Sequence, residues 1–275
     1  MSAVNAGKEF AALHALHDAD APTPLLLPNA WDHASASMLA AAGFRAVGTT
    51  SLGVAAAAGH PDGLRLTRAE TLRVAGILGG GDFLLSVDAE DGYSDDPGEV
   101  ADFARELAEA GAVGVNLEDG RPDGTLAAPE LHAAKIAAVK AAVPDLFVNA
   151  RTDTCWLDRQ HAETLPRLRA YQDAGADCLF VPGVGDVRRI AALVNEIDLP
   201  LNVLYRPGGP SIAELGGLGV RRVSLGSLLY RVALGAALDT ARAVREGRPA
   251  DECGQGAPSY ADVQRLAEPG VSAAG

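Results

Sequence analysis

Cysteine is scarce in this sequence. The 275 residues include only Cys155, Cys178 and Cys253, with no Cys-x-x-Cys pair and no metal-site spacing. An odd number of such thiols is typical of a reducing compartment and argues against a disulfide framework. Aromatic residues are also few, at 5% of the chain, whereas 48% of the residues are hydrophobic. We therefore expect a large, mainly aliphatic core.

Basic residues are outnumbered by acidic ones. The chain has 23 Lys and Arg against 36 Asp and Glu, a formal net charge of −13. Because such a surface repels nucleic acids and anionic membranes, we expect neither as a partner. No run approaches the roughly 18 apolar residues of a membrane span, and the N-terminal segment lacks the basic and apolar regions of a secretory signal. The sequence predicts a cytoplasmic protein in which any anionic ligand meets a local cation or a metal ion.

The motifs of several large enzyme classes are missing. The chain contains no Gly-x-Ser-x-Gly, no Walker A sequence and no set of kinase motifs. No Gly-x-Gly-x-x-Gly follows the first expected strand, which disfavours an open sheet of the dinucleotide-binding kind.

What the chain does contain is a regular alternation of apolar runs and helical segments. Helices between apolar runs indicate parallel crossovers, and the nearly continuous apolar runs suit strands that are covered on both faces. The pattern predicts an α/β fold, a (β/α)8 TIM-type barrel in a single domain over residues 1–275, with an open doubly wound sheet as the alternative. The eight expected strands are residues 25–28, 46–48, 83–88, 113–118, 146–151, 178–182, 200–204 and 221–225.

Two segments exceed what a barrel needs. An N-terminal helix within residues 1–24 is expected to cover the bottom of the barrel, because its apolar residues recur at helical spacing: Phe10, Leu13 and Leu16. The barrel occupies residues 25–245, and residues 246–275 form a C-terminal extension. The last helices have no core of their own, so we expect a protruding C-terminal helix that is exchanged with a neighbouring subunit.

Acidic side chains follow two of the expected strands. Asp88 and Glu90 end one strand and share a face if the strand continues that far, and Glu118 ends the next. The C-terminal ends of barrel strands meet at one mouth, where these carboxylates would repel one another unless a cation lies between them. Oxygen ligands alone favour Mg²⁺ or Mn²⁺. The alternative is that the acids after Asp88 only solvate a loop, and one of Asp95 and Asp96 is expected to cap the helix that follows.

Arg151 directly follows another apolar strand. A charge there is expensive unless paired, and the planar guanidinium suits a substrate carboxylate. It also suits a bridge to a neighbouring carboxylate such as Glu118, and both readings stay open. Asn202 lies inside an expected strand, where it can orient a second carboxylate or satisfy only backbone groups.

A polar break follows the second expected strand. Thr50, Ser51, Leu52 and Gly53 offer hydroxyl and backbone N–H donors for an anion, or they form a simple turn, and they lead into a long loop. His60 in that loop is expected to be solvated.

At these residues the chain resembles the isocitrate lyase / phosphoenolpyruvate mutase superfamily, in particular its short members related to 2-methylisocitrate lyase. The resemblance runs from about Leu25 to Arg231. Its carriers are LLLPNAWD, TSLG with GHPDG, SVDAEDGYSDDP, GVNLEDG, VNARTD and LNVLYRPGG. It implies a (β/α)8 barrel with a swapped helix, assembly as a dimer of dimers, and Mg²⁺-dependent cleavage or formation of C–C or P–C bonds through enolates of 2-oxo acids.

The resemblance also assigns roles to residues. It implies catalytic roles for Arg151, Glu118 and Asp62, the last of which matches an acid near the metal. The implied metal site comprises Asp88, Glu90 and Glu118. The implied substrate contacts are Thr50, Ser51, Leu52, Gly53, Asp88, Arg151 and Asn202.

The chain departs from this family at two places. The lyases carry a loop with a proton-carrying cysteine after the strand-four acid, whereas this chain reads EDGRPDGTLAAPE, with Arg121 as the nearby cation. The glutamate that methylisocitrate lyases carry after strand six is Gly183 here. The general acid would then have to be Tyr205, His60 or water.

We therefore predict a Mg²⁺- or Mn²⁺-dependent lyase that cleaves a C–C bond in a small 2-hydroxy or 2-oxo di- or tricarboxylate, of the methylisocitrate or dimethylmalate lyase kind. Decarboxylation or hydrolysis of oxaloacetate is the first alternative, because loss of CO₂ needs no separate base. A 2-oxo-acid-binding protein with little turnover is the second, and phosphonopyruvate chemistry ranks below both.

Overall fold

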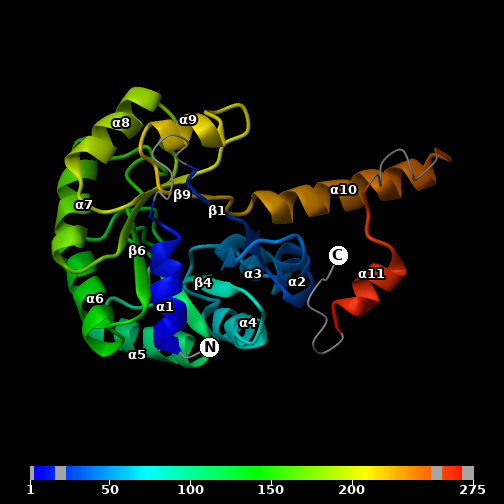
Figure 1. Ribbon diagram of the computed structural model, residues 1–275, viewed down its shortest axis with the longest axis horizontal. Coiled ribbons are helices and arrows are strands. Elements are labelled where there is room, and N and C mark those ends of the chain that lie inside the picture. Colours follow the sequence, from blue (N-terminus) through cyan, green and yellow to red (C-terminus); the bar gives the residue numbers. More distant parts are fainter. Residues whose placement is uncertain (1–2, 16–22, 249–255, 268–275) are drawn as a thin grey trace.

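One parallel sheet of nine strands forms the centre of the molecule (Figure 1). The computed structural model describes residues 3–15, 23–248 and 256–267. The sheet order is β1-β9-β8-β7-β6-β5-β4-β3-β2. The strands are β1 (Leu25–Leu27), β2 (Asn29–Ala30), β3 (Ala46–Thr49), β4 (Leu84–Asp88), β5 (Ala112–Glu118), β6 (Phe147–Arg151), β7 (Cys178–Val181), β8 (Leu201–Leu204) and β9 (Arg222–Ser224).

The two outermost strands, β1 and β2, are halves of one barrel strand. Pro28 separates them because it has no N–H to donate to a neighbouring strand. Its carbonyl still accepts a hydrogen bond from Gly48 N at 2.8 Å. Since β1 pairs with β9 and β2 pairs with β3, this strand joins the two ends of the sheet. The eight predicted strands and the TIM-type barrel are thus confirmed.

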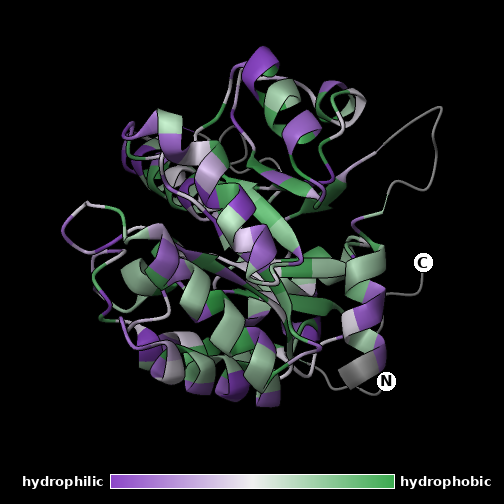
Figure 2. Cartoon of the chain, turned by 90° about the vertical axis from the view of Figure 1, so that its left-hand side faces the viewer, coloured by the Kyte–Doolittle hydropathy of each residue, from purple (hydrophilic) through white to green (hydrophobic). Residues whose placement is uncertain are grey.

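Helices surround the barrel and complete the alternation. Figure 2 shows hydrophobic strands inside and hydrophilic stretches on the outer helices. The elements are α1 (Ala3–Ala12), α2 (His33–Ala41), α3 (Ser51–Ala57), α4 (Arg68–Leu78), α5 (Pro97–Glu109), α6 (Pro129–Ala142), the 3₁₀ helix η1 (His161–Glu163), α7 (Thr164–Asp173), α8 (Val187–Glu196), α9 (Ile212–Gly217), α10 (Leu228–Arg245) and α11 (Tyr260–Arg265). None of the helices in these described ranges is long and apolar enough to cross a membrane.

Helix α1 covers the bottom of the barrel, as predicted. Phe10 is fully buried and belongs to a cluster with residues near the N-terminal ends of the strands, including Ala46, Leu84 and Phe147. Leu16, the last residue of the predicted apolar face, lies outside the described residues.

The long loop predicted after Gly53 is wrong in its first half. Residues Ser51–Ala57 form α3, in which Gly53, Val54 and Ala55 are buried. Alanine is the strongest helix former, and tertiary packing of this short segment outweighs the flexibility expected of its glycine.

The C-terminal helices lie outside the barrel wall. Helix α10 projects away from the barrel, and α11 turns back towards α2 (Figure 1). Along α10 the residues 231–239 are exposed. His33 Nε2 lies 2.8 Å from Leu266 O and links α2 to the end of α11. The protruding C-terminal helix is therefore confirmed.

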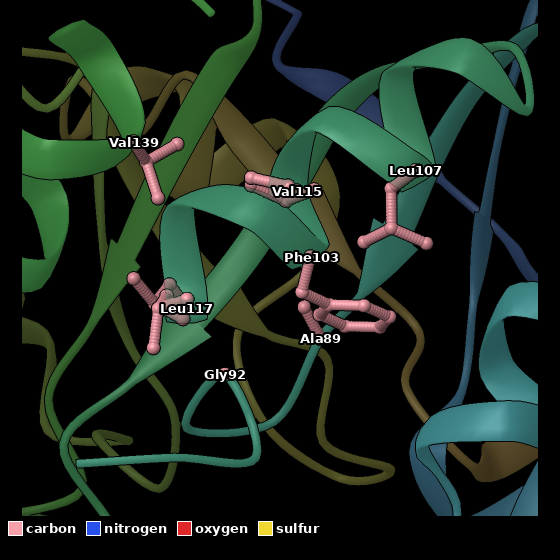
Figure 3. A pocket seen from close by; sticks show the side chains of 9 residues that line it. Ala89, Gly92, Phe103, Leu107, Val115, Leu117 and Val139 are labelled. Carbon is pink, nitrogen blue, oxygen red and sulfur yellow. The ribbon is translucent and has the colours of Figure 1, made fainter. Parts of the chain in front are cut away.

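A small apolar cavity lies behind the barrel wall, between β5 and the helices α5 and α6 (Figure 3). Its volume is about 10 Å³, and its lining includes Phe103, Leu107, Val115 and Val139. A void of this size with an apolar lining offers no polar group to a substrate, so it is a packing defect and separate from the chemistry at the mouth.

Candidate active site

The candidate catalytic residues converge at the C-terminal ends of three neighbouring strands. Asp88 is the last residue of β4, Glu118 of β5 and Arg151 of β6. Glu118 and Arg151 are paired in the strand register, and Asp88 is paired with Asn116 two residues before Glu118. The sequence prediction that these side chains meet at one mouth is consistent with this register.

Arg151 lies between two carboxylates. Its Nη1 is 2.7 Å from Glu118 Oε2, and its Nε and Nη2 donate to Asp153 at 2.6 and 3.1 Å. The guanidinium also lies 5.7 Å from the centre of the Phe180 ring. A guanidinium has five N–H groups, so three contacts leave one donor on each terminal nitrogen. The predicted bridge to Glu118 and a bidentate contact to a substrate carboxylate are therefore compatible.

The charges of this cluster shift one another's ionisation. Burial raises the pKa of Glu118 well above the usual glutamate value, by more than the neighbouring Arg151 lowers it. Burial also raises the pKa of Asp153 against the effect of Arg151. For Arg151, burial lowers the pKa, but the carboxylates of Asp153 and Glu118 outweigh it and leave a net upward shift. The guanidinium is thus the fixed charge around which the two acids are arranged.

Asp88 has a buried carboxylate oxygen, Oδ1, without a hydrogen-bond partner in the described structure. Its Oδ2 accepts from Ser51 N at 3.2 Å, and its own backbone N donates to Thr49 Oγ1 at 2.8 Å. Asp62 lies on the exposed rim nearby and accepts from the Ser51 hydroxyl; desolvation and the Asp88 carboxylate raise its pKa.

Glu90 reaches the site from a strained turn. The strand ends at Asp88, and Glu90 has φ of 50°, so the two acids do not share a strand face as the sequence spacing suggested. Glu90 Oε1 accepts from Thr67 Oγ1 at 2.8 Å and from the Tyr93 hydroxyl at 3.1 Å. Burial raises the pKa of Glu90 to about 7, with further contributions from Asp62 and Asp88.

The donor set fits a hard divalent cation that is held partly through water. The free Asp88 Oδ1 and the mutual repulsion among the acids are what such a cation relieves. Within the described ranges no three acidic, His or Cys side chains are drawn together into a closed ligand set. Glu90 Oε1 and Glu118 Oε2 are engaged by Thr67 and Arg151, whereas the free Asp88 Oδ1 can serve as a direct ligand. Mg²⁺ commonly binds through one or two carboxylates and keeps several waters.

A second charge cluster ties the loops around the mouth. Arg65 donates to Asp91 and Asp95, and Arg121 also contacts Asp95. The Lys135 ammonium donates to Asp91 O at 2.9 Å. The interpretation that Asp91 only solvates a loop is therefore wrong, because it is buried and paired. The predicted helix cap is Asp96, which accepts from Gly98 N at 2.7 Å.

The loop after β5 contains a tight turn. Gly120 and Leu126 form an antiparallel bridge, and Arg121 N donates to Thr125 O at 2.9 Å. Arg121 itself is engaged by Asp95. The loop after β5, which lacks the family's Cys and His, therefore offers no thiol or imidazole as a general acid or base.

The other predicted site residues are Asn202, which is held by contacts outside the cluster of acids around Arg151, and the segment from Thr50 to Gly53, which contributes the Ser51 backbone N–H. Asn202 is fully buried, and its amide donates to Ser224 Oγ at 3.1 Å. Its amide is thus satisfied inside the barrel. Thr50 precedes α3, and Gly53 is buried where a Cβ would lie 2.7 Å from Thr50 Cγ2 and 3.0 Å from Trp31 Cβ. Leu52 is half-buried on the first turn of α3.

Sequence reasoning missed the residues that hold the acids in place. Asp153 follows Arg151 by two positions, so the sequence shows that the two residues are near each other. The paired hydrogen bonds from Arg151 to Asp153 depend on a turn beyond the strand, which the sequence does not show. Thr67, the N-cap residue of α4, and Tyr93, from the same turn as Glu90, both bind Glu90. Tyr93 lies within the SVDAEDGYSDDP segment, but its spacing from Glu90 did not indicate this contact. Neither His60 nor Tyr205, the suggested acids, has a side-chain hydrogen bond to the cluster in the described structure.

Comparison with known proteins agrees with this fold. The family model described as phosphoenolpyruvate phosphomutase matches residues 13–245. The uncharacterized protein Rv1998c of Mycobacterium tuberculosis (strain ATCC 25618 / H37Rv) is 48% identical over 86% of this chain and 90% of its own length. An oxaloacetate decarboxylase of Pseudomonas fluorescens (strain SBW25) is 32% identical over 82% of this chain and 81% of its own length.

Two further similarities extend the comparison. A 2-methylisocitrate lyase of Bacillus subtilis (strain 168) is 32% identical over 66% of this chain and 62% of its own length. A crystal structure from Burkholderia cenocepacia J2315, described as a lyase/mutase, superposes with a TM-score of 0.88 and 37% identity over 99% of both chains. Together with the barrel and the carboxylates at its mouth, these matches show that the chain belongs to the phosphoenolpyruvate phosphomutase family of the isocitrate lyase / PEP mutase superfamily.

Proposed function

We propose that this protein is a divalent-cation-dependent lyase that cleaves a C–C bond in a small 2-hydroxy or 2-oxo di- or tricarboxylate, of the methylisocitrate or dimethylmalate lyase kind. The observation that carries this proposal is the juxtaposition of Arg151, with two free N–H donors, and the acids Asp88 and Glu118. The class of carbon–carbon lyase is supported by the relatives, which include a 2-methylisocitrate lyase and oxaloacetate decarboxylases.

The residues divide the task between charge and orientation. Arg151 would bind one carboxylate of the substrate, and the segment of Thr50, Ser51, Leu52 and Gly53, whose Ser51 N donates to Asp88, would contact the substrate from the side of Asp88. Asp88, Glu90 and Glu118 would hold Mg²⁺ or Mn²⁺, directly or through water, and the bound ion would supply positive charge beside the negative charge that develops on the 2-oxo acid.

The acids also have roles of their own. Asp62 lies on the rim beside Ser51 and Asp88, where it orients the bound acid and can hold a proton. Glu118 holds the Arg151 guanidinium at Nη1, on the side opposite to the one that Asp153 engages. Asn202 is also proposed as a substrate contact, in which case its amide would exchange the hydrogen bond that it donates to Ser224 for one to the substrate.

Oxaloacetate decarboxylation or hydrolysis is the second candidate, and the β5 loop favours it. The turn around Arg121 offers no Cys or His as a general acid. Loss of CO₂ from oxaloacetate needs no separate base and only requires that the developing negative charge be stabilised. A 2-oxo-acid-binding protein with little turnover and phosphonopyruvate chemistry are the remaining alternatives.

The assembly and location are part of the same proposal. The exposed α10 has no partner within the described chain over most of its length, so we propose that it packs on a second copy in a dimer of dimers. The net charge of −13 and the free thiols of Cys155 and Cys178 favour a cytoplasmic protein without nucleic-acid or membrane partners.

A substrate panel tests the proposal. Purified protein with Mg²⁺ is incubated with methylisocitrate, dimethylmalate, oxaloacetate and phosphonopyruvate, and pyruvate is followed by a coupled assay. We expect turnover of one of the first three, loss of turnover with a chelator, and recovery with Mg²⁺ or Mn²⁺. Asp88→Asn abolishes the activity, whereas Asp82→Asn, an exposed acid just before β4, leaves it unchanged. A ligand that raises the melting temperature without any product supports the binding-protein alternative.

A further inference from the structure

The orientation of Arg151 depends on Asp153. Arg151 Nε and Nη2 donate to the two oxygens of the Asp153 carboxylate at 2.6 and 3.1 Å, and this pair fixes the plane of the guanidinium. Asp153 lies past the end of β6, in a turn. The remaining donors of Arg151 therefore point at a substrate only if this turn is held in place.

Asp119 holds the backbone of that turn. It is fully buried, and its Oδ1 accepts from Asp153 N at 2.8 Å. Its Oδ2 accepts from Thr152 Oγ1 at 2.8 Å, from the Tyr171 hydroxyl at 2.7 Å and from Arg167 Nη1 at 3.1 Å. A buried carboxylate with four donors is a rigid anchor, because losing one donor leaves a desolvated charge only partly compensated.

Gly120 confines the Asp153 side chain from the other direction. A Cβ at Gly120 would lie 2.6 Å from Asp153 Oδ2 and 3.7 Å from Glu118 Oε1. Its backbone therefore approaches the carboxylate more closely than any other residue type allows. The atom that a side chain here would displace is the end of the Asp153 side chain, so the barrel itself can tolerate the change.

We propose that Asp119 and Gly120 are positioning residues that set the direction of the Arg151 guanidinium through Asp153. Three consecutive residues, Glu118, Asp119 and Gly120, then act on the Arg151 guanidinium. Glu118 contacts it directly. Asp119 anchors the turn that carries Asp153, and Gly120 leaves room for the Asp153 carboxylate. This inference rests on the proposed function in that Arg151 binds a substrate carboxylate.

A purely structural role for Asp119 predicts something different. Arg167 and Tyr171 come from α7, so the same carboxylate also joins that helix to the end of β5. If this were its whole function, changes near Asp119 would lower stability without a specific effect on Arg151. Gly120→Ala separates the two roles, because it displaces the Asp153 carboxylate and leaves every hydrogen bond of Asp119 possible.

The experiment compares Gly120→Ala with Gly76→Ala. Gly76 is exposed in α4, and nothing lies within 4 Å of its added Cβ. Binding of oxalate and of pyruvate in the presence of Mg²⁺ is measured by calorimetry, and crystal structures show the Arg151 side chain. We expect Gly120→Ala to weaken binding about tenfold and to break the Arg151–Asp153 contact in the crystal, whereas Gly76→Ala binds like wild type.

A double-mutant cycle identifies the route of the effect. In an Arg151→Lys background, which lacks the fork that Asp153 holds, Gly120→Ala should change binding less than about twofold. Thr152→Val, which removes one donor to Asp119 at nearly constant volume, should show the same dependence on Arg151. Equal losses in both backgrounds, or an Arg151 guanidinium that is unmoved in the Gly120→Ala crystal, would overturn the proposal. Failure of the wild type to bind either acid refutes the proposed function instead, and the crystal structures still decide the position of Arg151.

Discussion

Arg151 Nη1 lies 2.7 Å from Glu118 Oε2, so a residue implied in substrate binding is already paired with a residue implied in metal binding. Because Asp153 engages the opposite side of the same guanidinium, one cation serves two buried carboxylates. The group of three carries a net charge of −1 when all are ionised. A substrate anion is accepted there only if another positive charge enters with it. This requirement links substrate binding to binding of the divalent metal ion.

Replacing Arg151 should separate charge from geometry. Arg151→Lys retains the charge but loses the planar fork, and we expect kcat/KM to fall about 100-fold, or about 2.7 kcal/mol of transition-state stabilisation. Arg151→Gln also leaves Glu118 and Asp153 buried without a counter-charge, so it should cost about 3 to 5 kcal/mol of folding stability. Kinetics and urea unfolding of both variants check this. Arg105→Lys, at an exposed pair with Asp102, is the control. Equal stability of the Lys and Gln variants would contradict the argument.

Gly183 should resist restoration of the glutamate found in methylisocitrate lyases. Its φ is +82°, and an added Cβ would lie 2.8 Å from Cys155 O. Both the left-handed conformation and the backbone contact oppose any side chain, so Gly183→Ala and Gly183→Glu should each lower the free energy of unfolding by about 2 to 4 kcal/mol. Gly217→Ala, with nothing within 4 Å of the added Cβ, should have a much smaller effect in the same denaturant titration. A stable Gly183→Glu variant that gains methylisocitrate cleavage would show that the loop can move.

The sequence allowed the strand ends to be predicted because an apolar run followed by a charge marks the mouth of a barrel without any knowledge of packing. Asp88, Glu118 and Arg151 were found in this way. The turns beyond the strands follow other rules. Glu90 adopts a left-handed conformation that its residue type does not favour, and the turn is held by the pair of Arg65 and Asp91 across 26 residues.

Partners of that kind come from loops that are distant in sequence, which pattern reasoning does not connect. The same holds for α3. Its alanines follow a serine, a leucine and a glycine that were interpreted as an anion-binding break, and only burial against the barrel decides that Ser51 begins a helix. The anchor formed by Asp119 was equally hidden, because its donors come from β6 and α7.

The exposed face of α10 should carry the contact between subunits. Leu234 and Leu238 are 54% and 51% exposed and lie one helical turn apart, so they form an apolar stripe. Leu238→Glu should place a charge in that contact and reduce the mass measured by light scattering, while circular dichroism remains unchanged. Ile77→Glu on α4, at a site with 47% exposure, is the matched control. An unchanged mass for Leu238→Glu would show that the stripe is not an interface.

Two buried histidines should make the fold sensitive to mild acid. Burial lowers the pKa of His14 to about 3 and that of His132 to about 4, from an ordinary value of 6.5. Between the folded-state pKa and 6.5, each histidine binds a proton in the unfolded chain but not in the folded chain. The free energy of unfolding is therefore highest above pH 6.5 and declines as the pH falls towards 4. Each histidine contributes a slope of up to about 1.4 kcal/mol per pH unit. His14→Phe keeps the ring contacts with Phe10 and Phe147 and should flatten the plot of unfolding free energy against pH by that amount. Parallel plots for wild type and variant would show that His14 takes no part in the acid response.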